Sequence, residues 1–325
     1  MKAAIVTAPG KAPVYADFDE PIGKPGEELV AVRASALGQF SKSRASGSHY
    51  SSAGAFPAIA GSDGVGVTPD GKRVYFALPE APFGALAEFC PVRAKQCVPL
   101  PDALDDVTAA AIANPGMSAR AALVVRAQLV PGETVLINGA TGTAGRLSVQ
   151  LAKYLGAAKV IATARNVQEL EEVKQLGADT IIPFTLGAHN PSGADDYEDA
   201  LKQAFASGID VVIDYLWGES AKTVIVAIAK AVDDARPVRF VHVGGSSGEA
   251  NIDLPGAALR TSAIMLMGSG VKSVPFPALL QSVGKVFEAV HPAALNIATR
   301  VVPLAEVETT WDNAPGKPRI VFSIP

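Results

Sequence analysis

The stretch Thr134-Val-Leu-Ile-Asn-Gly-Ala-Thr-Gly-Thr-Ala-Gly145 decides the fold of this chain. An apolar run stops at a loop with glycines at 139, 142 and 145, and an amphipathic helix pattern begins at once. This order predicts a strand, a glycine turn and a helix N-terminus. Such a turn lets backbone N–H groups approach a pyrophosphate, whose negative charge the helix dipole favours. Because the spacing is G-x-x-G-x-x-G and not G-x-G-x-x-G, the surrounding sequence must support this interpretation.

The residues around this loop repeat the strand–helix alternation of a parallel sheet. The expected strands are apolar throughout, as when helices cover both faces. We expect strands at Thr134–Asn138, Lys159–Thr163, Thr180–Ile182, Ile209–Asp214, Val238–Val243 and Ser262–Met267, and helices at Gly145–Leu155, Val167–Leu176, Tyr197–Ala206 and Glu219–Ala231. The pattern predicts a doubly wound, dinucleotide-binding sheet of the Rossmann type.

The two ends of the chain do not show the strand–helix alternation of the middle. Before residue 125, short β-rich runs are cut by Gly, Pro and Asp turns. They are Lys2–Thr7, Glu28–Leu37, Gly64–Val67, Arg73–Ala77 and Glu88–Pro91. After residue 270, helices at Phe276–Val290 and Leu304–Asn313 and strands at Ile297–Val302 and Arg319–Phe322 make a tail too short for its own domain. We therefore predict one domain from 1–125 plus 270–325, with a dinucleotide-binding domain at 126–269 inserted.

Composition limits the classes of partner. The chain has 325 residues, 49% apolar and 18% charged, which suits two compact domains. A net charge of −4 without blocks of like charge argues against nucleic acid and anionic membranes. Cys90 and Cys97 cannot form a disulfide framework, and no signal peptide or span of bilayer length is visible. We therefore expect a cytoplasmic protein.

The end of the second predicted strand indicates the nucleotide. An NAD site usually places Asp or Glu there, on the ribose 2′-OH. Here the segment is Ala162-Thr-Ala-Arg-Asn166, with Arg165 and no carboxylate. A guanidinium can hold a 2′-phosphate by charge-assisted bonds, so the sequence favours NADPH. The alternative is that Arg165 is a solvated loop arginine.

Two further strand ends should face the same crevice, because ligands bind outside the carboxyl ends of parallel strands. They are Asp214-Tyr-Leu-Trp-Gly218 and Val241-His-Val-Gly-Gly-Ser-Ser-Gly248. Gly244 and Gly245 would let the backbone approach the nicotinamide half. Asp214 could equally cap the following helix, and Trp217 could be a hydrophobic lid or a domain-interface residue.

The chain resembles the zinc-free, quinone-oxidoreductase branch of the medium-chain dehydrogenase/reductase superfamily, which includes zeta-crystallin. The motifs of this resemblance keep their order along nearly the whole chain. They are Phe83-Gly-Ala-Leu-Ala-Glu-Phe89, Pro99-Leu-Pro-Asp102, Ala109-Ala-Ala-Ile112, Met117-Ser-Ala-Arg-Ala-Ala-Leu123, Asn138 to Gly145, Val149-Gln-Leu-Ala-Lys153, Gln175-Leu-Gly-Ala-Asp179, Ile209–Asp214 and Gly316-Lys-Pro-Arg-Ile-Val321. The resemblance implies a GroES-like catalytic domain of irregular β structure made of both chain ends, with the nucleotide domain inserted and the active site in the cleft between them.

The zinc-dependent branch of that superfamily has ligands that this chain lacks. There a Cys lies near Gly38–Gln39 and a His-Glu pair follows Gly61, whereas this chain has Ala36-Leu-Gly-Gln-Phe40 and Gly61-Ser-Asp-Gly64. The four-cysteine structural zinc lobe is also missing, and the four histidines are scattered. We therefore predict no metal.

Without a metal, alcohol oxidation loses its usual Lewis acid, whereas reduction of an activated acceptor remains possible. A quinone or an α,β-unsaturated carbonyl accepts hydride at carbon, and hydrogen-bond donors stabilise the charge that develops on oxygen. By resemblance, Arg44, Gly47 and Tyr50 match a family motif, and Tyr50 is the predicted proton donor or carbonyl-orienting residue. The alternative is a packing tyrosine. Gln39 and Ser41 are candidate substitutes for an Asn that the family often has before this segment.

The remaining predictions concern cofactor contacts and assembly. Asn114-Pro-Gly116 predicts a helix break before Ser118, which by resemblance lies near the nicotinamide. Gly268 and Ser269 follow the last strand of the sheet and could touch the nicotinamide too. The predicted cofactor residues are Ser118, Asn138, Gly139, Ala140, Thr141, Gly142, Thr143, Ala144, Gly145, Ala164, Arg165, Asn166, Tyr215, Val243, Gly244, Gly245, Gly268 and Ser269. The resemblance also implies a homodimer paired through the strand at 262–267, which would cover an apolar edge.

The leading hypothesis is an NADPH-dependent, metal-independent oxidoreductase acting on quinones or conjugated carbonyls. The alternatives are an enoyl-thioester reductase, which would need a basic patch for the phosphates of its carrier, and a non-enzymatic NADPH-binding protein with a structural or RNA-binding role. The low positive charge argues against RNA.

Overall fold

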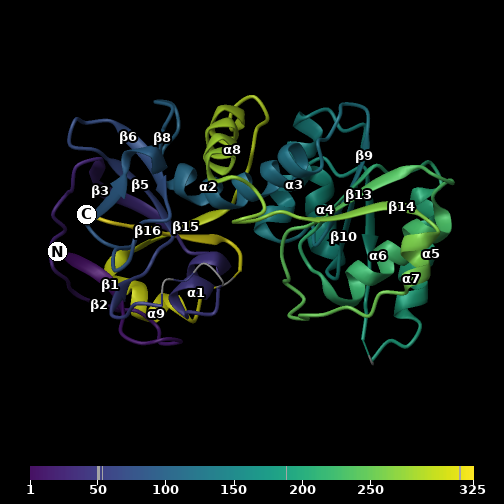
Figure 1. The fold of residues 1–325 in the computed structure, drawn as a ribbon, viewed down its shortest axis with the longest axis horizontal. Coiled ribbons are helices and arrows are strands. Elements are labelled where there is room, and N and C mark those ends of the chain that lie inside the picture. The colour runs from purple at the N-terminus through teal and green to yellow at the C-terminus, as the bar shows by residue number, and fades with distance from the viewer. Residues whose placement is uncertain (50–51, 53, 188, 315) are drawn as a thin grey trace. The chain divides into compact units, whose positions relative to one another are not determined.

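The computed structural model describes residues 1–49, 52, 54–187, 189–314 and 316–325. They fold into two compact units (Figure 1). The terminal unit joins both ends of the chain, Met1–Met117 and Leu280–Pro325, and the central unit is Ser118–Leu279. The domain limits that the sequence predicts, at 125/126 and 269/270, stay a prediction.

The central unit is built on a sheet of six strands in the order β11-β10-β9-β12-β13-β14. The strands are β9 (Thr134–Asn138), β10 (Lys159–Ala164), β11 (Thr180–Pro183), β12 (Val211–Asp214), β13 (Pro237–His242) and β14 (Ala263–Gly268). Every neighbouring pair runs parallel. The first strand of this sheet, β9, lies in its middle. The next two strands, β10 and β11, extend the sheet to one side of β9, and β12, β13 and β14 then extend it to the other side. This is the predicted doubly wound α/β arrangement, and the prediction is confirmed.

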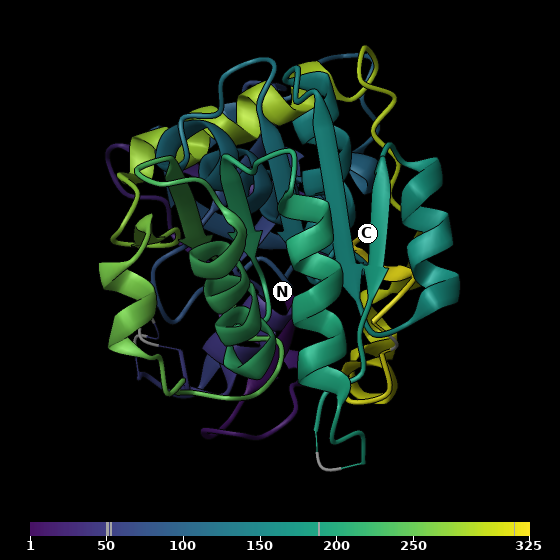
Figure 2. The same cartoon turned by 90° about the vertical axis from the view of Figure 1, so that its right-hand side faces the viewer.

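Helices follow the strands because each βαβ connection needs an amphipathic crossover. They are α3 (Thr143–Tyr154), α4 (Val167–Gln175), α5 (Gly193–Phe205), α6 (Gly218–Ala231) and α7 (Gly256–Arg260). Leu136, Ile161 and Phe240 of the strands pack with Phe205 of α5 and Ile228 of α6 in one buried cluster. Figure 2 shows α5, α6 and α7, in the green part of the colour scale, in front of one face of the sheet. Burying each such side chain stabilises the fold by about 1.5–3 kcal/mol.

The terminal unit is mostly antiparallel. Its larger sheet has the order β15-β16-β3-β5-β6-β8, with β7 paired to β3, and its smaller sheet has the order β2-β1-β4. The strands are β1 (Lys2–Val6), β2 (Val14–Asp17), β3 (Glu27–Ala36), β4 (Ala58–Ile59), β5 (Asp63–Val67), β6 (Arg73–Ala77), β7 (Phe89–Arg93), β8 (Cys97–Pro99), β15 (Thr299–Pro303) and β16 (Arg319–Ser323). The strand β16 pairs with β3, so the tail returns to the N-terminal β structure as predicted.

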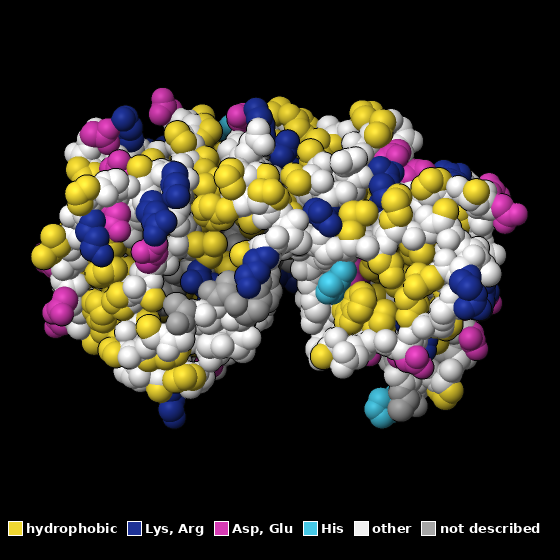
Figure 3. Space-filling model, in the orientation of Figure 1, with side chains coloured by type: hydrophobic (Ala, Val, Ile, Leu, Met, Phe, Trp, Pro, Cys, Tyr) yellow, Lys and Arg dark blue, Asp and Glu magenta, His cyan; other side chains and the backbone are white. Residues whose placement is uncertain are grey.

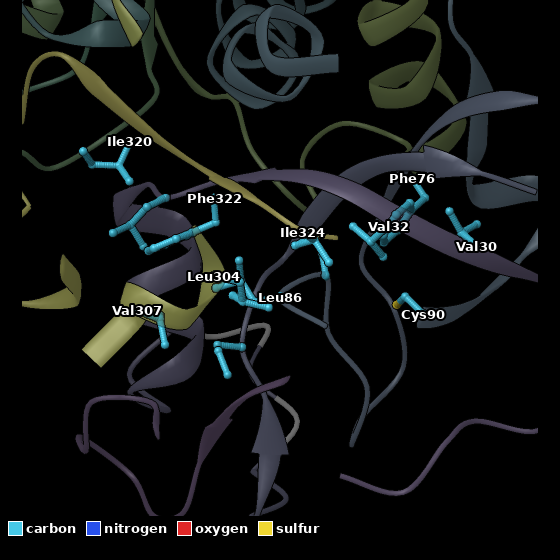
Figure 4. Packing of buried hydrophobic residues seen from close by; sticks show 14 of the residues in the cluster. Val30, Val32, Phe76, Leu86, Cys90, Leu304, Val307, Ile320, Phe322 and Ile324 are labelled. Atoms are coloured by element: carbon cyan, nitrogen blue, oxygen red, sulfur yellow. The ribbon is translucent and has the colours of Figure 1, made fainter. Parts of the chain in front are cut away.

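The core of the terminal unit joins the two chain ends. Val32 of β3 and Phe76 of β6 belong to the same buried cluster as Phe322 of β16 and Leu304, which precedes α9 (Val307–Trp311). Figure 4 shows these side chains together. Successive side chains of a strand point to opposite faces of the sheet, so the apolar side chains of each strand can lie together on its inner face.

The helix α2 (Asp106–Arg120) corrects one prediction. Pro115 lies inside it, so the predicted break at Asn114-Pro-Gly116 is wrong. A proline removes one hydrogen bond, but tertiary packing can hold the turns on either side. The alanines from 109 to 113 are fully buried, and a Cβ on Gly116 would lie 2.7 Å from Val286 Cγ1, so this helix is packed closely. A π-helical segment, Ala121–Arg126, follows it.

The other helices are α1 (Gln39–Ala45) and α8 (Phe276–Ala289), and short 3₁₀ turns cover Ala94–Gln96 and Leu304–Glu306. Across the described ranges, no helix has both the length and the apolar character that a membrane crossing would need. On the face drawn in Figure 3, basic and acidic side chains are interspersed.

Candidate functional site

The glycine loop of the central unit is shaped by close backbone contacts. Gly139 has φ +87°, a left-handed conformation that favours glycine. A Cβ on Gly145 would lie 2.3 Å from Gly139 O, so only glycine fits there. The helix α3 begins after Gly142 without a side-chain cap. Its first N–H groups are therefore left for another acceptor, which is the arrangement of an anion-binding helix N-terminus.

Asn138, just before this loop, has its side chain in the interior. Its Nδ2 donates to Asp214 Oδ1 at 2.8 Å and to Ser220 Oγ at 3.2 Å, and its Oδ1 accepts from Thr163 Oγ1 at 2.8 Å. The side chain is fully buried. It therefore ties β9 to β10, β12 and α6, and the predicted cofactor contact of Asn138 stays a prediction for its main chain.

Asp214 is held at the carboxyl end of β12 by several donors. Besides Asn138, the N–H groups of Leu216 and Trp217 donate to its carboxylate at 3.1–3.2 Å, and His242 Nδ1 lies 2.9 Å from Oδ2. The helix α6 has Trp217, not Asp214, at its N-cap, so Asp214 secures the turn before the helix. His242 was not among the predicted site residues. Its position at the end of a buried strand is the signal that could have identified it.

Trp217 has an unusual backbone conformation. Its φ of +62° and ψ of −158° are rare for a residue with a side chain, and such conformations cost about 1–3 kcal/mol. Its ring lies 4.5 Å from the ring of His242 between centroids. Strained residues of this kind cluster at functional sites. Trp217 and His242 therefore indicate that the ends of β12 and β13 belong to the candidate functional site.

The end of β10 has the chemistry that the sequence predicts. Ala164 is buried, and Arg165 is exposed directly after it. Asn166 is the N-cap of α4, and its Oδ1 accepts from Glu169 N at 3.2 Å. The structure therefore leaves one cation, Arg165, exposed at this strand end, with Asn166 used as a helix cap.

Segments distant in sequence meet at the ends of β12, β13 and β14. The hydroxyl of Tyr215 pairs with Ser148 Oγ at 2.6 Å. Burial raises the pKa of Tyr215, and its side-chain hydrogen bonds with Ser148 and Ser118 act in the opposite direction. The N–H groups of Val243 and Gly244 donate to Asp214 O.

The glycines on this side leave space. No atom lies within 4 Å of a Cβ built on Gly245 or Gly268, and the nearest to Gly244 is 3.5 Å away. Ser269 N donates to His242 O at 2.9 Å, which fixes the chain after β14 beside the end of β13. The predicted cofactor residues from these segments are therefore brought together within the central unit.

The terminal unit contains a separate pocket of about 70 Å³. Ser41, Arg44 and Ser62 line it with polar groups, and its apolar lining includes Phe56, Ile59, Ala60 and Phe83. Of the predicted catalytic residues, Ser41 is buried in this lining and Gln39 is exposed at the start of α1. Tyr50 lies outside the described residues.

A chain of hydrogen bonds leads from this pocket to a buried carboxyl group. Ser41 Oγ and Ser62 Oγ are 2.8 Å apart, and Ser62 Oγ donates to Asp63 Oδ1 at 2.5 Å. The hydroxyl of Tyr75 donates to Asp63 Oδ2 at 3.2 Å. Burial raises the pKa of Asp63, against the opposing effects of Ser62, Arg319, Tyr75 and Arg44.

Two guanidinium groups surround this carboxyl group. Burial lowers the pKa of both Arg44 and Arg319, and the charge of Asp63 opposes this. The Nε of Arg319 is buried without a hydrogen-bond partner in the described structure. Sequence reasoning missed Asp63, Tyr75 and Arg319 as site residues. The segment Gly61-Ser-Asp-Gly64 showed only which zinc ligands are absent.

Among the residues placed in the structure, no three His, Cys, Asp or Glu side chains gather as a metal ion would require. The absence of a metal stays a prediction.

Comparison with known proteins gives consistent matches. Residues 144–284 match a family model described as zinc-binding dehydrogenase. The chain is 29% identical to a probable NADPH-dependent quinone reductase of Emericella nidulans, over 100% of both chains. It is 32% identical to the chloroplastic NADPH-dependent alkenal/one oxidoreductase of Arabidopsis thaliana, over 50% of this chain and 46% of that protein. The solved quinone oxidoreductase of Thermus thermophilus superposes with a TM-score of 0.80 at 23% identity, covering 100% of both chains, which shows the same fold.

Proposed function

Because the chain belongs to the zinc-free, quinone-oxidoreductase branch of the medium-chain dehydrogenase/reductase superfamily, we propose that it is an NADPH-dependent oxidoreductase that reduces a quinone or an α,β-unsaturated carbonyl. The relatives named above are described as NADPH-dependent quinone and alkenal/one reductases. The glycine loop, after which α3 begins without a side-chain cap, supports the same function.

The observation that most directly supports NADPH is the end of β10. Arg165 is exposed there, and neither Ala164 nor Asn166 has a carboxylate that would repel a 2′-phosphate. The N-terminus of α3 is suited to the pyrophosphate. We propose that Gly244, Gly245, Gly268 and Ser269 approach the nicotinamide half, because they gather at the same edge of the sheet.

The proposed chemistry needs no metal. NADPH, when bound, supplies the hydride. The protein orients the acceptor and stabilises the negative charge that develops on its oxygen. Ser41, Gln39 and Tyr50 are the residues proposed for this role, and of the two that the structure describes, Ser41 lines the pocket of the terminal unit.

We also propose a cytoplasmic homodimer. The strand β14 is at the edge of the central sheet, and Met265 and Leu266 on it are 44% and 42% exposed. An apolar edge strand is normally covered, and pairing with its copy would do this. Free Cys90 and Cys97 fit a reducing compartment.

The test is nucleotide selectivity. We expect NADPH to bind well ahead of NADH in a fluorescence titration. Replacing Arg165→Ala should weaken NADPH binding by roughly 10–100-fold, since hydrogen bonds to charged groups contribute about 1.5–3 kcal/mol, and should leave NADH binding unchanged. Arg260→Ala, which removes another exposed arginine of the central unit, is the matched control.

Turnover is measured in parallel, as NADPH oxidation with a panel of small quinones and α,β-unsaturated ketones. Equal binding of the two nucleotides, or an Arg165→Ala protein that keeps the full preference, would remove the proposed role of Arg165. Tight NADPH binding without turnover of any acceptor would contradict the enzymatic function.

A further inference from the structure

We propose that Ser41, Ser62 and Asp63 of the terminal unit form a proton relay, which delivers the proton that must follow hydride to the oxygen of the acceptor bound in the adjoining pocket. This inference rests on the proposed function and identifies its proton donor. Reduction of a conjugated carbonyl consumes one hydride and one proton, so an enzyme that takes hydride from NADPH needs a separate proton source.

The geometry provides a continuous path. Ser41 Oγ and Ser62 Oγ are 2.8 Å apart, and Ser62 Oγ is 2.5 Å from Asp63 Oδ1. Both serines are lining residues of the pocket, whereas Asp63 is not among them and has 2% of its surface exposed. A hydroxyl can donate and accept at once, so each serine can pass a proton along this path. The two serines therefore form a hydrogen-bonded path between the carboxyl group and the pocket.

The pocket suits the oxygen end of a conjugated carbonyl. Its polar lining includes Ser41, Ser62, Ser52 and Arg44, and Phe56, Ile59 and Phe83 belong to its apolar lining. Donors placed where negative charge develops stabilise an enolate or a quinol anion, and apolar walls fit the unsaturated carbon frame. Among the described lining residues, none has a carboxylate that would repel such an oxygen.

The groups around Asp63 allow it to gain and lose a proton. Ser62 and Tyr75 are its hydrogen-bond partners, and both are neutral hydroxyls. Arg44 of α1 and Arg319 of β16 are the cations that act on it, and both favour its ionised form. Burial acts in the opposite direction. The proposal places a proton on this buried carboxyl before reaction, and the guanidinium groups stabilise the carboxylate that remains afterwards.

The proton balance is as follows. Hydride from NADPH forms a C–H bond on the acceptor, and the π-electron pair moves to the carbonyl oxygen. In the reacting state the protonated Asp63 carboxyl donates to Ser62 Oγ, the reverse of the hydrogen bond in the structure, and the Ser62 hydroxyl turns toward the acceptor oxygen or Ser41. Ser62 then gives its proton to that oxygen, directly or through Ser41, and takes one from the Asp63 carboxyl. The products are NADP⁺, the enol or quinol, and an ionised Asp63. Asp63 regains its proton from water along the same serines after the product leaves.

The experiment uses the full chain with saturating NADPH and an acceptor that the wild type reduces. Asp63→Asn keeps the size of the side chain but cannot transfer a proton, and Ser62→Ala breaks the path while keeping the carboxyl. We expect kcat to fall by about 10²-fold or more in both variants, with the Kd for NADPH unchanged.

Two further variants separate a relay from a structural network. Ser35 donates to the main-chain oxygen of Asp63 at 2.8 Å, so Ser35→Ala disturbs the same residue outside the path and should keep kcat. The rate should fall as pH rises through the pKa of Asp63, because the protonated form is the donor. Tyr75→Phe removes a hydrogen bond that lowers this pKa, so it should move that fall to higher pH.

The relay is overturned if folded Ser62→Ala and Asp63→Asn proteins retain the wild-type kcat, or if Ser35→Ala loses as much as they do. Should Asp63→Asn fail to fold, Ser62→Ala decides the question. A wild type that reduces no acceptor rejects the proposed function, and the relay with it. Turnover that is insensitive to Ser62 and Asp63 rejects the relay alone.

Discussion

Each unit of the molecule buries one aspartate beside a proposed site, but the two carboxyl groups are held in different ways. Asp214 of the central unit accepts from the main-chain N–H groups of Leu216 and Trp217 and from the side chains of Asn138 and His242. Asp63 of the terminal unit has two hydroxyl partners, Ser62 and Tyr75. Amide donors fix a carboxylate in place, whereas hydroxyls can also accept and pass protons. The first arrangement suits architecture, and the second suits proton transfer.

The largest expected effect comes from exchanging each carboxylate for an amide. Asp214→Asn places an NH₂ group beside the N–H groups that donate to Asp214, so some of these buried N–H groups lose their acceptor. The free energy of unfolding should therefore fall by about 3 kcal/mol. Asp63→Asn keeps partners that can donate to or accept from an amide, and should cost about 1 kcal/mol. Urea unfolding followed by circular dichroism measures both.

Activity should show the reverse order. After correction for the folded fraction, Asp214→Asn should retain more turnover than Asp63→Asn. Equal losses of stability in the two variants, or a larger loss for Asp63→Asn, would mean that both aspartates serve the architecture.

The two units also differ in how much of their fold could be predicted from the sequence. In the central unit, β9 has the predicted bounds Thr134–Asn138, and the glycine loop and helix follow it directly. The information is local, because an apolar run, a turn and an amphipathic helix are adjacent in the chain. The strand order then follows from the rules for parallel crossovers. The fold of this unit was therefore predictable, including the exposed position of Arg165 after its strand.

The terminal unit was predictable only in outline. The buried network joins Ser41 of α1, Ser62 just before β5, Asp63 of β5 and Tyr75 of β6, and nothing in any one segment shows that they meet. Antiparallel pairing between distant strands has no signature in local periodicity. The wrong break at Pro115 has the same cause, since packing around α2 holds a helix that local propensity would end.

Alanine substitutions at two glycines test this difference, since one glycine is in close contact with its own loop and the other with a distant segment. A Cβ on Gly145 would lie 2.3 Å from Gly139 O within the same loop, and one on Gly84 would lie 2.2 Å from Ile59 O on another segment. Replacing either with alanine should cost about 1–3 kcal/mol by overpacking. Gly145→Ala should weaken NADPH binding. Gly84→Ala should leave it unchanged and lower turnover, because Ile59 and Ala60 line the pocket.

The control is Gly23→Ala, since Gly23 belongs to neither proposed site, no atom lies within 4 Å of a Cβ built on it, and the stability of this variant should stay close to that of the wild type. Thermal unfolding and the NADPH titration give both readouts. If Gly84→Ala impaired NADPH binding as strongly as Gly145→Ala, the assignment of nucleotide and acceptor to different units would be wrong.

The smallest expected effect is the pH dependence of stability that Asp63 contributes. Burial raises its pKa above the ordinary value of 3.8, so the folded protein binds this proton more tightly than the unfolded chain. The resulting stability is fully present below the unfolded pKa and is lost as pH rises through the folded pKa. Asn cannot titrate, so the stability difference between wild type and Asp63→Asn should be largest in acid and decline toward neutral pH. Unfolding free energies of both proteins, measured across that range, should converge as pH rises. A difference that instead grows with pH would show that Arg44 and Arg319 hold Asp63 ionised, and it could not then be the proton donor.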